Sequence, residues 1–339
     1  MEGLGFSLKI EASLENLTEE VLKSSEIEGE LLNRDQVRSS IARRLGVDIG
    51  GLTPAHRNVE GVVEMMLDAT QAYEKPLTKA RLSAWHASLF PTGRSGMLKI
   101  TVGAWRKDVA GPMQVVSGPI GRERVHYQAP AAPKVADEMA AFLHWFNARS
   151  KMDAVLKAGV AHLWFVTIHP FDDGNGRIAR ALTDLMLARS EESTLRFYSM
   201  SAQIRAERND YYHLLELTQK GDLDITDWME WFLSCLKRAF EGAEIQLAAG
   251  MIKAQFWEHH RAVVLNERQR LMLNKILDGF DGKLTASKWA VITKCSADTA
   301  LRDIDTLIEK RILRRDAAGG RSTSYSLAEL ASSRATNGR

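Results

Sequence analysis

Residues 169–180 read His-Pro-Phe-Asp-Asp-Gly-Asn-Gly-Arg-Ile-Ala-Arg, and this stretch decides the interpretation of the whole chain. An apolar helix is predicted to end at Ile168, and a histidine, two acids and a Gly-Asn-Gly turn then lead into the next helix. Small residues at such a turn let backbone N–H groups converge on an anion, and the dipole of the following helix adds to the attraction. The stretch is therefore typical of a phosphate-binding turn.

The charged side chains of this stretch suit phosphate chemistry. Arg177 and Arg180 are three residues apart on the predicted helix, so they project from one face and can hold successive phosphates. Asp173 supplies a hard oxygen ligand for Mg²⁺, which usually binds through one or two carboxylates together with substrate phosphates. His169 belongs to the residue type that best accepts a proton near neutral pH. Each residue alone is more often structural, but no packing role requires all of them at these offsets.

The stretch resembles the motif of the Fic family, His-Pro-Phe-x-[Asp/Glu]-Gly-Asn-Gly-Arg-x-x-Arg, and matches it at every specified position. The best-known activity of that family is the transfer of AMP from ATP to a protein hydroxyl, with pyrophosphate as the leaving group. The resemblance implies that His169 is the general base, that Asp173 holds Mg²⁺, and that Arg180 holds the γ-phosphate. The other phosphate contacts that it implies are Gly174, Asn175, Gly176 and Arg177.

Two further segments resemble the parts of the Fic family that surround the nucleotide. Residues 114–118, Gln-Val-Val-Ser-Gly, are similar to the flap that covers it. The flap contacts implied are Val115, Val116, Ser117 and Gly118. Residues 208–219 are similar to the helix on the adenosine side, which implies contacts from Tyr211, Tyr212 and Gln219. Aromatic residues on an amphipathic helix are otherwise core residues, and Gln219 stands where some members of the family have asparagine.

Residues 24–29, Ser-Ser-Glu-Ile-Glu-Gly, match the inhibitory pattern of the family, [Ser/Thr]-x-x-x-Glu-[Gly/Asn]. We expect a first helix over residues 14–32, on which Ser24 and Glu28 lie on one face because they are four residues apart. If that face meets the Gly-Asn-Gly turn, Glu28 will pair with Arg180 and Ser24 will add a hydrogen bond. An arginine held by a carboxylate is not free for a γ-phosphate, so the resemblance implies an autoinhibited enzyme.

The composition is that of a folded globular protein, with 339 residues, of which 45% are hydrophobic and 26% charged. This length suggests roughly two domains. The net charge of +2 gives no global attraction to nucleic acid or to an anionic membrane. Two cysteines, Cys235 and Cys295, are interpreted as packing residues in a reducing compartment. The longest apolar stretch, 161–168, is too short to cross a bilayer, so we expect a cytoplasmic protein without a membrane partner.

Apolar residues recur at three- and four-residue spacing along most of the chain, which predicts a mainly α fold. The predicted helices after the first cover residues 59–73, 77–89, 135–146, 155–168, 178–187, 211–219 and 225–245. Between residues 103 and 127, Gly-Pro pairs flank the short run Val115-Val116, and this pattern predicts a β-hairpin. The expected architecture is a Fic-type helical bundle with this hairpin as its flap.

The C-terminal part of the chain is predicted to form a small winged helix-turn-helix domain. One predicted helix covers residues 267–277, a second begins at Thr285, and a third begins after the N-cap residue Ser296. A wing at 312–313 and 324–327 follows, with a turn at Gly319-Gly320. The predicted domains are an N-terminal helical region with the inhibitory pattern (residues 1–90), a catalytic core (91–265), the winged helix (266–330) and a flexible tail (331–339).

Three functions are compatible with the sequence. The first is a Mg²⁺-dependent protein adenylyltransferase, inhibited by Glu28, that modifies a target protein or itself. The second is removal of AMP, with Glu28 positioning a water molecule. The third is a nucleotide-sensing DNA-binding regulator, although the helix after Ser296 is too acidic to suit a phosphate backbone, with Asp298, Asp303, Asp305 and Glu309. Candidate DNA contacts are Arg314, Arg315 and Arg321, and docking of protein or formation of a homodimer is an equally good use of this domain.

Overall fold

The computed structural model describes residues 6–49, 51–109, 111–119, 122–280, 282–316 and 323–328. The chain forms two compact units, residues 1–243 and 244–339. The predicted tail at 331–339, the Gly319-Gly320 turn and Arg321 lie outside the described residues. No described helix combines the length and the apolar composition that a membrane span needs.

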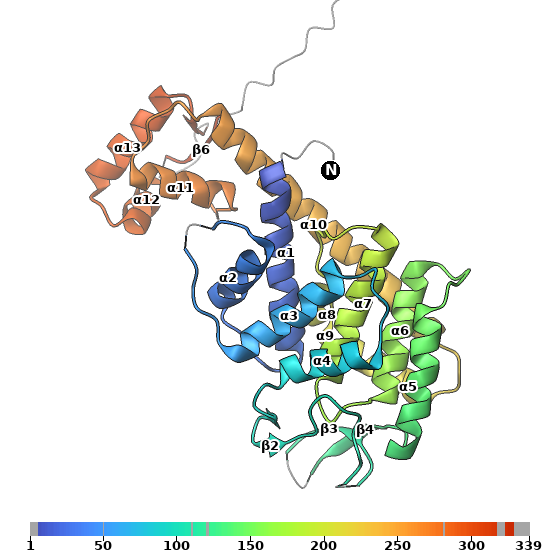
Figure 1. Ribbon diagram of the computed structural model, residues 1–339. Helices are drawn as coiled ribbons and strands as arrows, with labels where there is room; N and C mark the ends of the chain where they lie inside the picture. Colours follow the sequence, from blue (N-terminus) through green and yellow to red (C-terminus); the bar gives the residue numbers. More distant parts are fainter. Residues whose placement is uncertain are drawn as a thin grey trace, which may run out of the picture. The chain divides into compact units, whose positions relative to one another are not determined.

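The first unit is mainly helical, as predicted (Figure 1). Its helices are α1 (Phe6–Ile27), α2 (Arg34–Leu45), α3 (Arg57–Gln71), α4 (Lys79–Leu89), α5 (Ala132–Asn147), α6 (Ala154–Ile168), α7 (Asn175–Glu191), α8 (Met200–Ala206), α9 (Arg208–Lys220) and the first part of α10 (Thr226–His259). Its strands pair in sequence order, β1 (Arg94–Ser95) with β2 (Leu98–Lys99) and β3 (Gln114–Ser117) with β4 (Arg124–Gln128). The second pair is the predicted flap hairpin.

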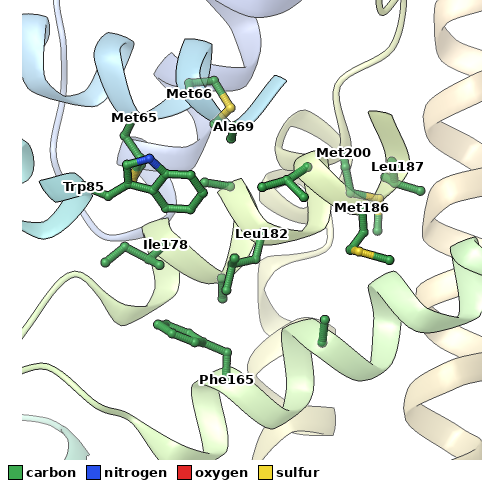
Figure 2. Packing of buried hydrophobic residues seen from close by; sticks show 14 of the residues in the cluster. Met65, Met66, Ala69, Trp85, Phe165, Ile178, Leu182, Met186, Leu187 and Met200 are labelled. Atoms are coloured by element: carbon green, nitrogen blue, oxygen red, sulfur yellow. The ribbon is translucent and has the colours of Figure 1, made fainter. Parts of the chain in front are cut away.

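Helices α6 and α7 form the centre of this unit. Residues on nearly every side of α7 are buried, from Asn175 to Ala188, which is expected for a helix surrounded by protein. Figure 2 shows Phe165 of α6 and Leu182 of α7 among apolar side chains of α3, α4 and α8. Helices α3 and α4 cross closely at Gly61, where an added Cβ would lie 1.7 Å from the carbonyl oxygen of Ser88. This core fixes the position of the turn between α6 and α7.

Helix α1 is fastened to the same unit through a buried carboxylate. Glu20 accepts hydrogen bonds from Ser199 Oγ at 2.6 Å and from the Ser201 amide at 3.0 Å, and these residues begin α8. A buried carboxylate is tolerated only with such donors. The contact fixes where the C-terminal end of α1 meets the rest of the unit.

The structure corrects the predicted extent of several elements. Helix α1 ends at Ile27 rather than at residue 32, because Gly29 has a φ of 84° and the chain turns there, which leaves Leu31 83% exposed. Helices α2 and α8 were not predicted, since α2 buries two serines among few apolar residues and α8 is short. Helix α10 continues to His259, beyond the predicted end at residue 245.

The second unit contains the end of α10, then α11 (Glu267–Leu277), α12 (Ala286–Thr293), α13 (Ala297–Glu309), β5 (Leu313–Arg315) and β6 (Tyr325–Leu327). Strands β5 and β6 are antiparallel, with Leu313 opposite Leu327. Ser296 caps α13 as predicted, since its side chain accepts a hydrogen bond from the Thr299 amide. This order of three helices and two strands is the one predicted for a winged helix.

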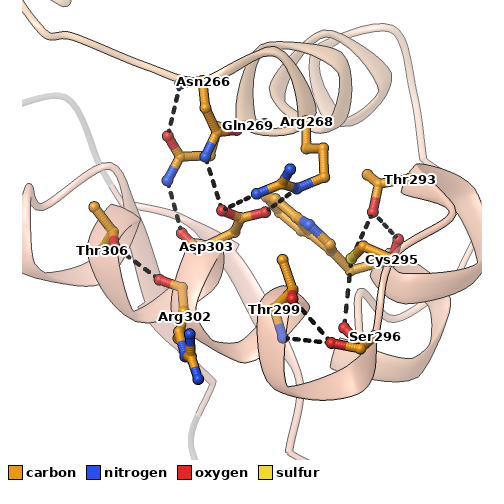
Figure 3. Close-up of polar contacts among 11 residues, drawn as sticks. Asn266, Arg268, Gln269, Thr293, Cys295, Ser296, Thr299, Arg302, Asp303 and Thr306 are labelled. Carbon is orange, nitrogen blue, oxygen red and sulfur yellow. Dashed lines mark hydrogen bonds and ion pairs between the residues drawn. The ribbon is translucent and has the colours of Figure 1, made fainter.

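Asp303 of α13 joins this helix to α11 (Figure 3). Its carboxylate accepts hydrogen bonds from Arg268 Nε at 2.7 Å and from Asn266 Nδ2 at 2.8 Å. Gln269 donates to the backbone carbonyl of Asp303 at 3.0 Å. Burial acts to raise the pKa of Asp303, but the hydrogen bonds from Arg268 and Asn266 outweigh it and leave the pKa below its usual value. Asp303, one of the acids that made this helix a poor fit to DNA, therefore has a structural role.

Asp303→Ala is expected to destabilise the second unit by about 1 kcal/mol, because the half-exposed Arg268 and the exposed amide of Asn266 lose their buried acceptor. Hydrogen exchange followed by mass spectrometry should show faster exchange in α11 and α13 and no change in the first unit. Since the folded pKa of Asp303 is lowered, its contribution is present above the unfolded pKa of about 3.9 and is lost as the pH falls through the folded value. Glu309→Ala, an exposed acid of the same helix, is the control. Equal exchange in both variants would contradict this role.

Candidate active site

The turn between α6 and α7 is shaped by backbone contacts around His169. His169 ends α6 with a φ of 51°, and its amide donates to the Phe165 carbonyl at 3.0 Å. Arg106 holds the turn from the other side, because its Nε donates to the His169 carbonyl at 2.7 Å and its amide donates to the Pro170 carbonyl at 3.0 Å. Sequence analysis missed this buried arginine, because it lies in the long connection between β2 and β3.

The His169 side chain is arranged to accept a proton. Its Nδ1 lies 3.2 Å from the Val166 carbonyl, and a carbonyl can only accept, so the proton is assigned to Nδ1 and the lone pair to Nε2. Burial of the ring lowers the pKa of His169, which favours the neutral form near pH 7. A neutral imidazole with a free Nε2 is the form that a general base requires.

Helix α7 begins with an open N-terminus. Its N-cap residue, Gly174, has a φ of 78° and provides no side-chain cap. The Asn175 side chain instead accepts from the Phe171 amide at 3.0 Å and donates to the Phe171 carbonyl at 2.8 Å, so it shapes the loop. The backbone amides of the first turn are left to bind an anion. Any contact of Asn175 with phosphate would therefore come from its backbone.

His86 supports this loop from α4. Its Nδ1 accepts from the Gly103 amide at 3.0 Å, its Nε2 lies 3.2 Å from the Asp173 carbonyl, and its ring stacks on Phe171 at 4.2 Å. Burial lowers the pKa of His86 to about 4, so the ring is neutral near pH 7 and Nε2 carries the proton. Sequence analysis missed this residue, because its partners are far away in the chain.

The Asp173 carboxylate fits a magnesium ion that is shared with a substrate. Asp173 Oδ2 accepts a hydrogen bond from Ser95 Oγ, and Oδ1 accepts one from the Gly174 amide. The ligand on offer is a carboxylate oxygen, a hard donor that Mg²⁺ prefers, rather than the sulfur or imidazole that softer metals prefer. Among the described residues, no three His, Cys, Asp or Glu side chains gather to hold a metal alone. A magnesium ion bound by Asp173 would take its other ligands from phosphates and water.

Arg180 is held by the last turn of α1 and by the turn that follows it, with the predicted contact to Glu28. Its Nη2 donates to Glu28 Oε1 at 2.7 Å, and its Nε donates to Ser24 Oγ at 2.9 Å. Glu28 lies in the turn after α1 rather than on the helix, which corrects the expectation that both residues share a helical face. An added Cβ at Gly176 would lie 2.1 Å from Glu28 Oε1. Glycine at this position therefore leaves room for the Glu28 carboxylate beside Arg180.

A second carboxylate of the same segment holds Arg177. Arg177 Nη1 donates to Glu30 Oε2 at 2.7 Å, and the guanidinium lies 5.1 Å from the centre of the Phe90 ring. Glu30 was not predicted, although it follows Glu28 by two residues. Arg177 Nε and Arg180 Nη1 are buried and have no hydrogen-bond partner among the described residues. Such donors are costly when unpaired, and a phosphate could satisfy them.

Comparison with known proteins identifies this arrangement. Residues 76–187 match the model of the Fic/DOC family. This part of the chain therefore resembles a Fic domain. Residues 1–47, which include the segment that holds Arg180, match a domain of unknown function, DUF4172.

Relatives of this chain include named adenylyltransferases. "Protein adenylyltransferase Fic" from Drosophila virilis is 26% identical over 235 residues, which cover 68% of this chain and 43% of that protein. "Protein adenylyltransferase fic-1" from Caenorhabditis briggsae is 38% identical over 97 residues, 28% of this chain and 18% of that protein. The chain thus spans less than half the length of these relatives. A Fic family protein from Desulfovibrio desulfuricans G20 has a TM-score of 0.53 at 21% identity, covering 97% of this chain and 90% of that one, and shares the fold.

The remaining predicted nucleotide contacts of the Fic domain lie on the flap and on α9. Val115, Val116 and Ser117 form most of β3, and Gly118 begins the turn with a φ of 102°. Tyr211 is 1% exposed, and its hydroxyl lies 2.9 Å from His162 Nε2, so its side chain belongs to the core. The half-buried Tyr212 packs against Arg208 and reaches the Ile27 carbonyl. Gln219 donates to Thr167 Oγ1 at 3.3 Å.

Outside the Fic domain, the predicted DNA contacts of the wing are engaged within the second unit. Arg315 donates to Asp305 of α13 at 2.9 Å, and Arg314 Nε donates to Ser326 Oγ at 3.2 Å. Each of these contacts competes with a phosphate for the arginine. The described part of the wing therefore gives no added support to DNA binding.

Proposed function

We propose that the chain is a protein adenylyltransferase that moves AMP from ATP to a hydroxyl of a target protein or of itself, and that Glu28 inhibits it. The observation that carries the proposal is the placement of Arg180. Its guanidinium is buried beside an open helix N-terminus, one nitrogen is held by Glu28, and another has no partner among the described residues. This arrangement suits an anion that competes with a carboxylate.

His169 takes the proton of the attacking hydroxyl on its Nε2. The hydroxyl oxygen forms a bond with the α-phosphorus, the bond from that phosphorus to the bridging oxygen of the β-phosphate breaks, and pyrophosphate leaves. The amides of the first turn of α7 and the two arginines hold the phosphates, so that positioning and charge stabilisation lower the barrier. Magnesium, when bound through Asp173, neutralises developing charge on the phosphate oxygens.

Glu28 opposes this reaction by charge and by position. Its carboxylate occupies Arg180 and lies against Gly176 at the N-terminus of α7, where a phosphate would bind. An anion already at that helix end repels a second one and removes the arginine from it. ATP then binds with its α-phosphorus out of line for attack. The inhibition ends only when the Glu28 carboxylate leaves Arg180.

Incubation of the full chain with labelled ATP, Mg²⁺ and a cell lysate tests the activity directly. We expect proteins that carry AMP, identified by the mass of the modified peptide, and no label when Mg²⁺ is chelated. If ATP were hydrolysed without any modified protein, or if a different nucleotide fragment were transferred, the proposed function would be wrong.

Asp173→Asn is expected to raise the Mg²⁺ concentration for half-maximal activity at least about tenfold, because the amide is a weaker ligand than the carboxylate. Titration of AMP transfer with Mg²⁺ measures this shift. Asp172→Asn is the matched control, since residue 172 accepts from the Thr101 amide at 2.8 Å and an amide oxygen can still do so. Equal Mg²⁺ requirements in both variants would remove Asp173 as the metal ligand.

Glu30→Gln is expected to raise self-modification about 1.4-fold to fivefold. The Glu30 side chain is 34% exposed, and an ion pair of this kind contributes roughly 0.2 to 1 kcal/mol. Initial rates with labelled ATP measure the change, and Glu26→Gln, which loses only surface contacts to Lys23 and Arg205, is the control. A rate no higher than that of the control would show that the inhibition acts through Arg180 alone and not through Arg177.

A further inference from the structure

A cavity of about 660 Å³ lies between β2 and the start of β3, next to the turn that binds phosphate. Figure 1 shows these two strands at the same end of the first unit. Asp172, which precedes the proposed metal ligand Asp173, forms part of the lining. None of the lining residues is among the proposed contacts with ATP. The rest of the lining comes from residues 98–101, 107–109 and 111–114.

Two hydrogen bonds hold the walls of this cavity against the catalytic turn. In one wall, the Thr101 amide donates to Asp172 Oδ2 at 2.8 Å. In the other, Arg106 Nε donates to the His169 carbonyl at 2.7 Å, and Lys107 is the next residue. An extended chain advances only about 3.4 Å per residue. A polypeptide that presents a hydroxyl to His169 can therefore place one of its neighbouring residues in the cavity.

Two lysines of the lining are available to an anionic partner. Lys99 and Lys107 are both exposed, and neither has a carboxylate partner within the part of the chain that the structure describes. Positive charge is concentrated in this segment, because residues 94–124 carry six basic and two acidic side chains, whereas the whole chain has a net charge of only +2. The basic residues are Arg94, Lys99, Arg106, Lys107, Arg122 and Arg124, and the acidic ones are Asp108 and Glu123.

The two acids of the lining are engaged in other contacts. Asp108 accepts hydrogen bonds from Arg106 Nη1 and from the Ala132 amide, the latter at 2.7 Å. Asp172 uses Oδ2 for the Thr101 amide. A basic side chain that entered the cavity would compete for these carboxylates and would meet two unopposed lysines. An acidic side chain would meet the same lysines with opposite charge, so the cavity favours an acidic occupant.

We propose that this cavity binds an acidic segment of the target protein, and that Lys99 and Lys107 select targets with aspartate or glutamate near the hydroxyl that accepts AMP. This inference rests on the proposed adenylyltransferase activity and names the class of its substrate. Leu98 and Val109 are 73% and 90% exposed, and they add apolar contact to the same segment. The lysines act through the binding of the target and take no part in the transfer itself.

The test uses the full chain with Glu28→Gly and maps AMP on lysate proteins by peptide mass spectrometry. We expect acidic residues to be enriched within about five residues of the modified hydroxyl, which is roughly 17 Å of extended chain. Lys99→Glu combined with Lys107→Glu should remove this enrichment and favour sites with basic neighbours, since the free charges of the cavity are reversed. Lys75→Glu combined with Lys151→Glu makes the same change of charge at exposed positions of the first unit and should leave the preference unchanged.

Kinetics with a synthetic peptide of the most strongly labelled site distinguish target binding from damage to the active site. Lys99→Gln combined with Lys107→Gln should raise the KM for this peptide about twofold to thirtyfold, the range for two exposed ion pairs. The kcat and the affinity for MgATP should stay within about twofold, because the lysines contact neither the phosphates nor His169. High salt should raise the KM of the parent and have less effect on that of the variant.

Each other outcome has a definite meaning. A site preference that is the same in the parent and in the charge-reversed variant would overturn this inference and leave the proposed function intact. A loss of MgATP affinity that accounts for the whole effect would assign the lysines to the nucleotide and also overturn it. The absence of AMP on any protein would overturn both proposals.

Discussion

His169→Ala is expected to lower AMP transfer to target proteins by about 10²- to 10⁴-fold, the usual contribution of a positioned general base. The Nε2 lone pair, which burial keeps available near pH 7, is lost. The turn itself should persist, because Arg106 and α6 hold it through the backbone carbonyl and amide of residue 169 rather than through the ring. Initial rates with labelled ATP and a lysate measure the effect.

ATP binding distinguishes a lost base from a lost site. We expect the affinity of the His169→Ala variant for MgATP to stay within about threefold of the parent, since the arginines and the α7 amides are unchanged. Calorimetric titration of ATP provides this measurement. Near-normal transfer by the variant would falsify the role of His169, and a parallel loss of binding and transfer would indicate a structural role instead.

Glu28→Gly is expected to raise self-modification at least about tenfold, which corresponds to about 1.4 kcal/mol off the barrier. The substitution removes the carboxylate from Arg180 Nη2, whereas the contacts of Arg180 with Ser24 remain. The guanidinium is then free to hold a γ-phosphate, and bound ATP can align its α-phosphorus. Labelling with ATP over a range of concentrations separates a faster reaction from tighter binding.

Two variants control for the flexibility that glycine introduces. Glu26→Gly, two residues earlier on α1, tests the backbone effect, because Glu26 contacts Lys23 and Arg205 and not Arg180. The double variant Glu28→Gly with Arg180→Ala should lose the gain. If Glu28→Gly labels no faster than the parent, Glu28 is not inhibitory. If it loses the ability to remove AMP from a modified protein, Glu28 is a hydrolytic residue.

The parts of the site that were predictable are contiguous in the chain or belong to a known pattern. The turn at 169–180 appears in the sequence as one uninterrupted motif, and the pairing of Glu28 with Arg180 followed from the inhibitory pattern at 24–29. Arg106, His86 and Glu30 could not be found in this way. Each acts through contacts with residues that only the fold brings near, such as the carbonyl of His169 or the guanidinium of Arg177.

The helices can likewise be divided into those that were predictable from the sequence and those that were not. Helices with apolar residues at regular spacing, such as α3 and α6, were predicted close to their true bounds. Helix α2 was missed because Ser39 and Ser40 occupy part of its buried face, where the periodic signal relies on apolar residues. The end of α1 was placed too late because Leu31 and Leu32 continue the apolar spacing, and a glycine turn overrides it.

Gly176 contributes both to the proposed phosphate-binding turn and to the contact of Glu28 with the N-terminus of α7. It gives a backbone amide to the anion-binding turn, and its missing side chain leaves room for the Glu28 carboxylate, because an added Cβ would lie 2.1 Å from Oε1. Any substitution there that expelled the carboxylate would also alter the surface on which a phosphate rests. A ligand, a modification or a partner that activates the proposed transfer is therefore expected to move residues 24–30 away from Arg180, because α7 is packed within the core of its unit.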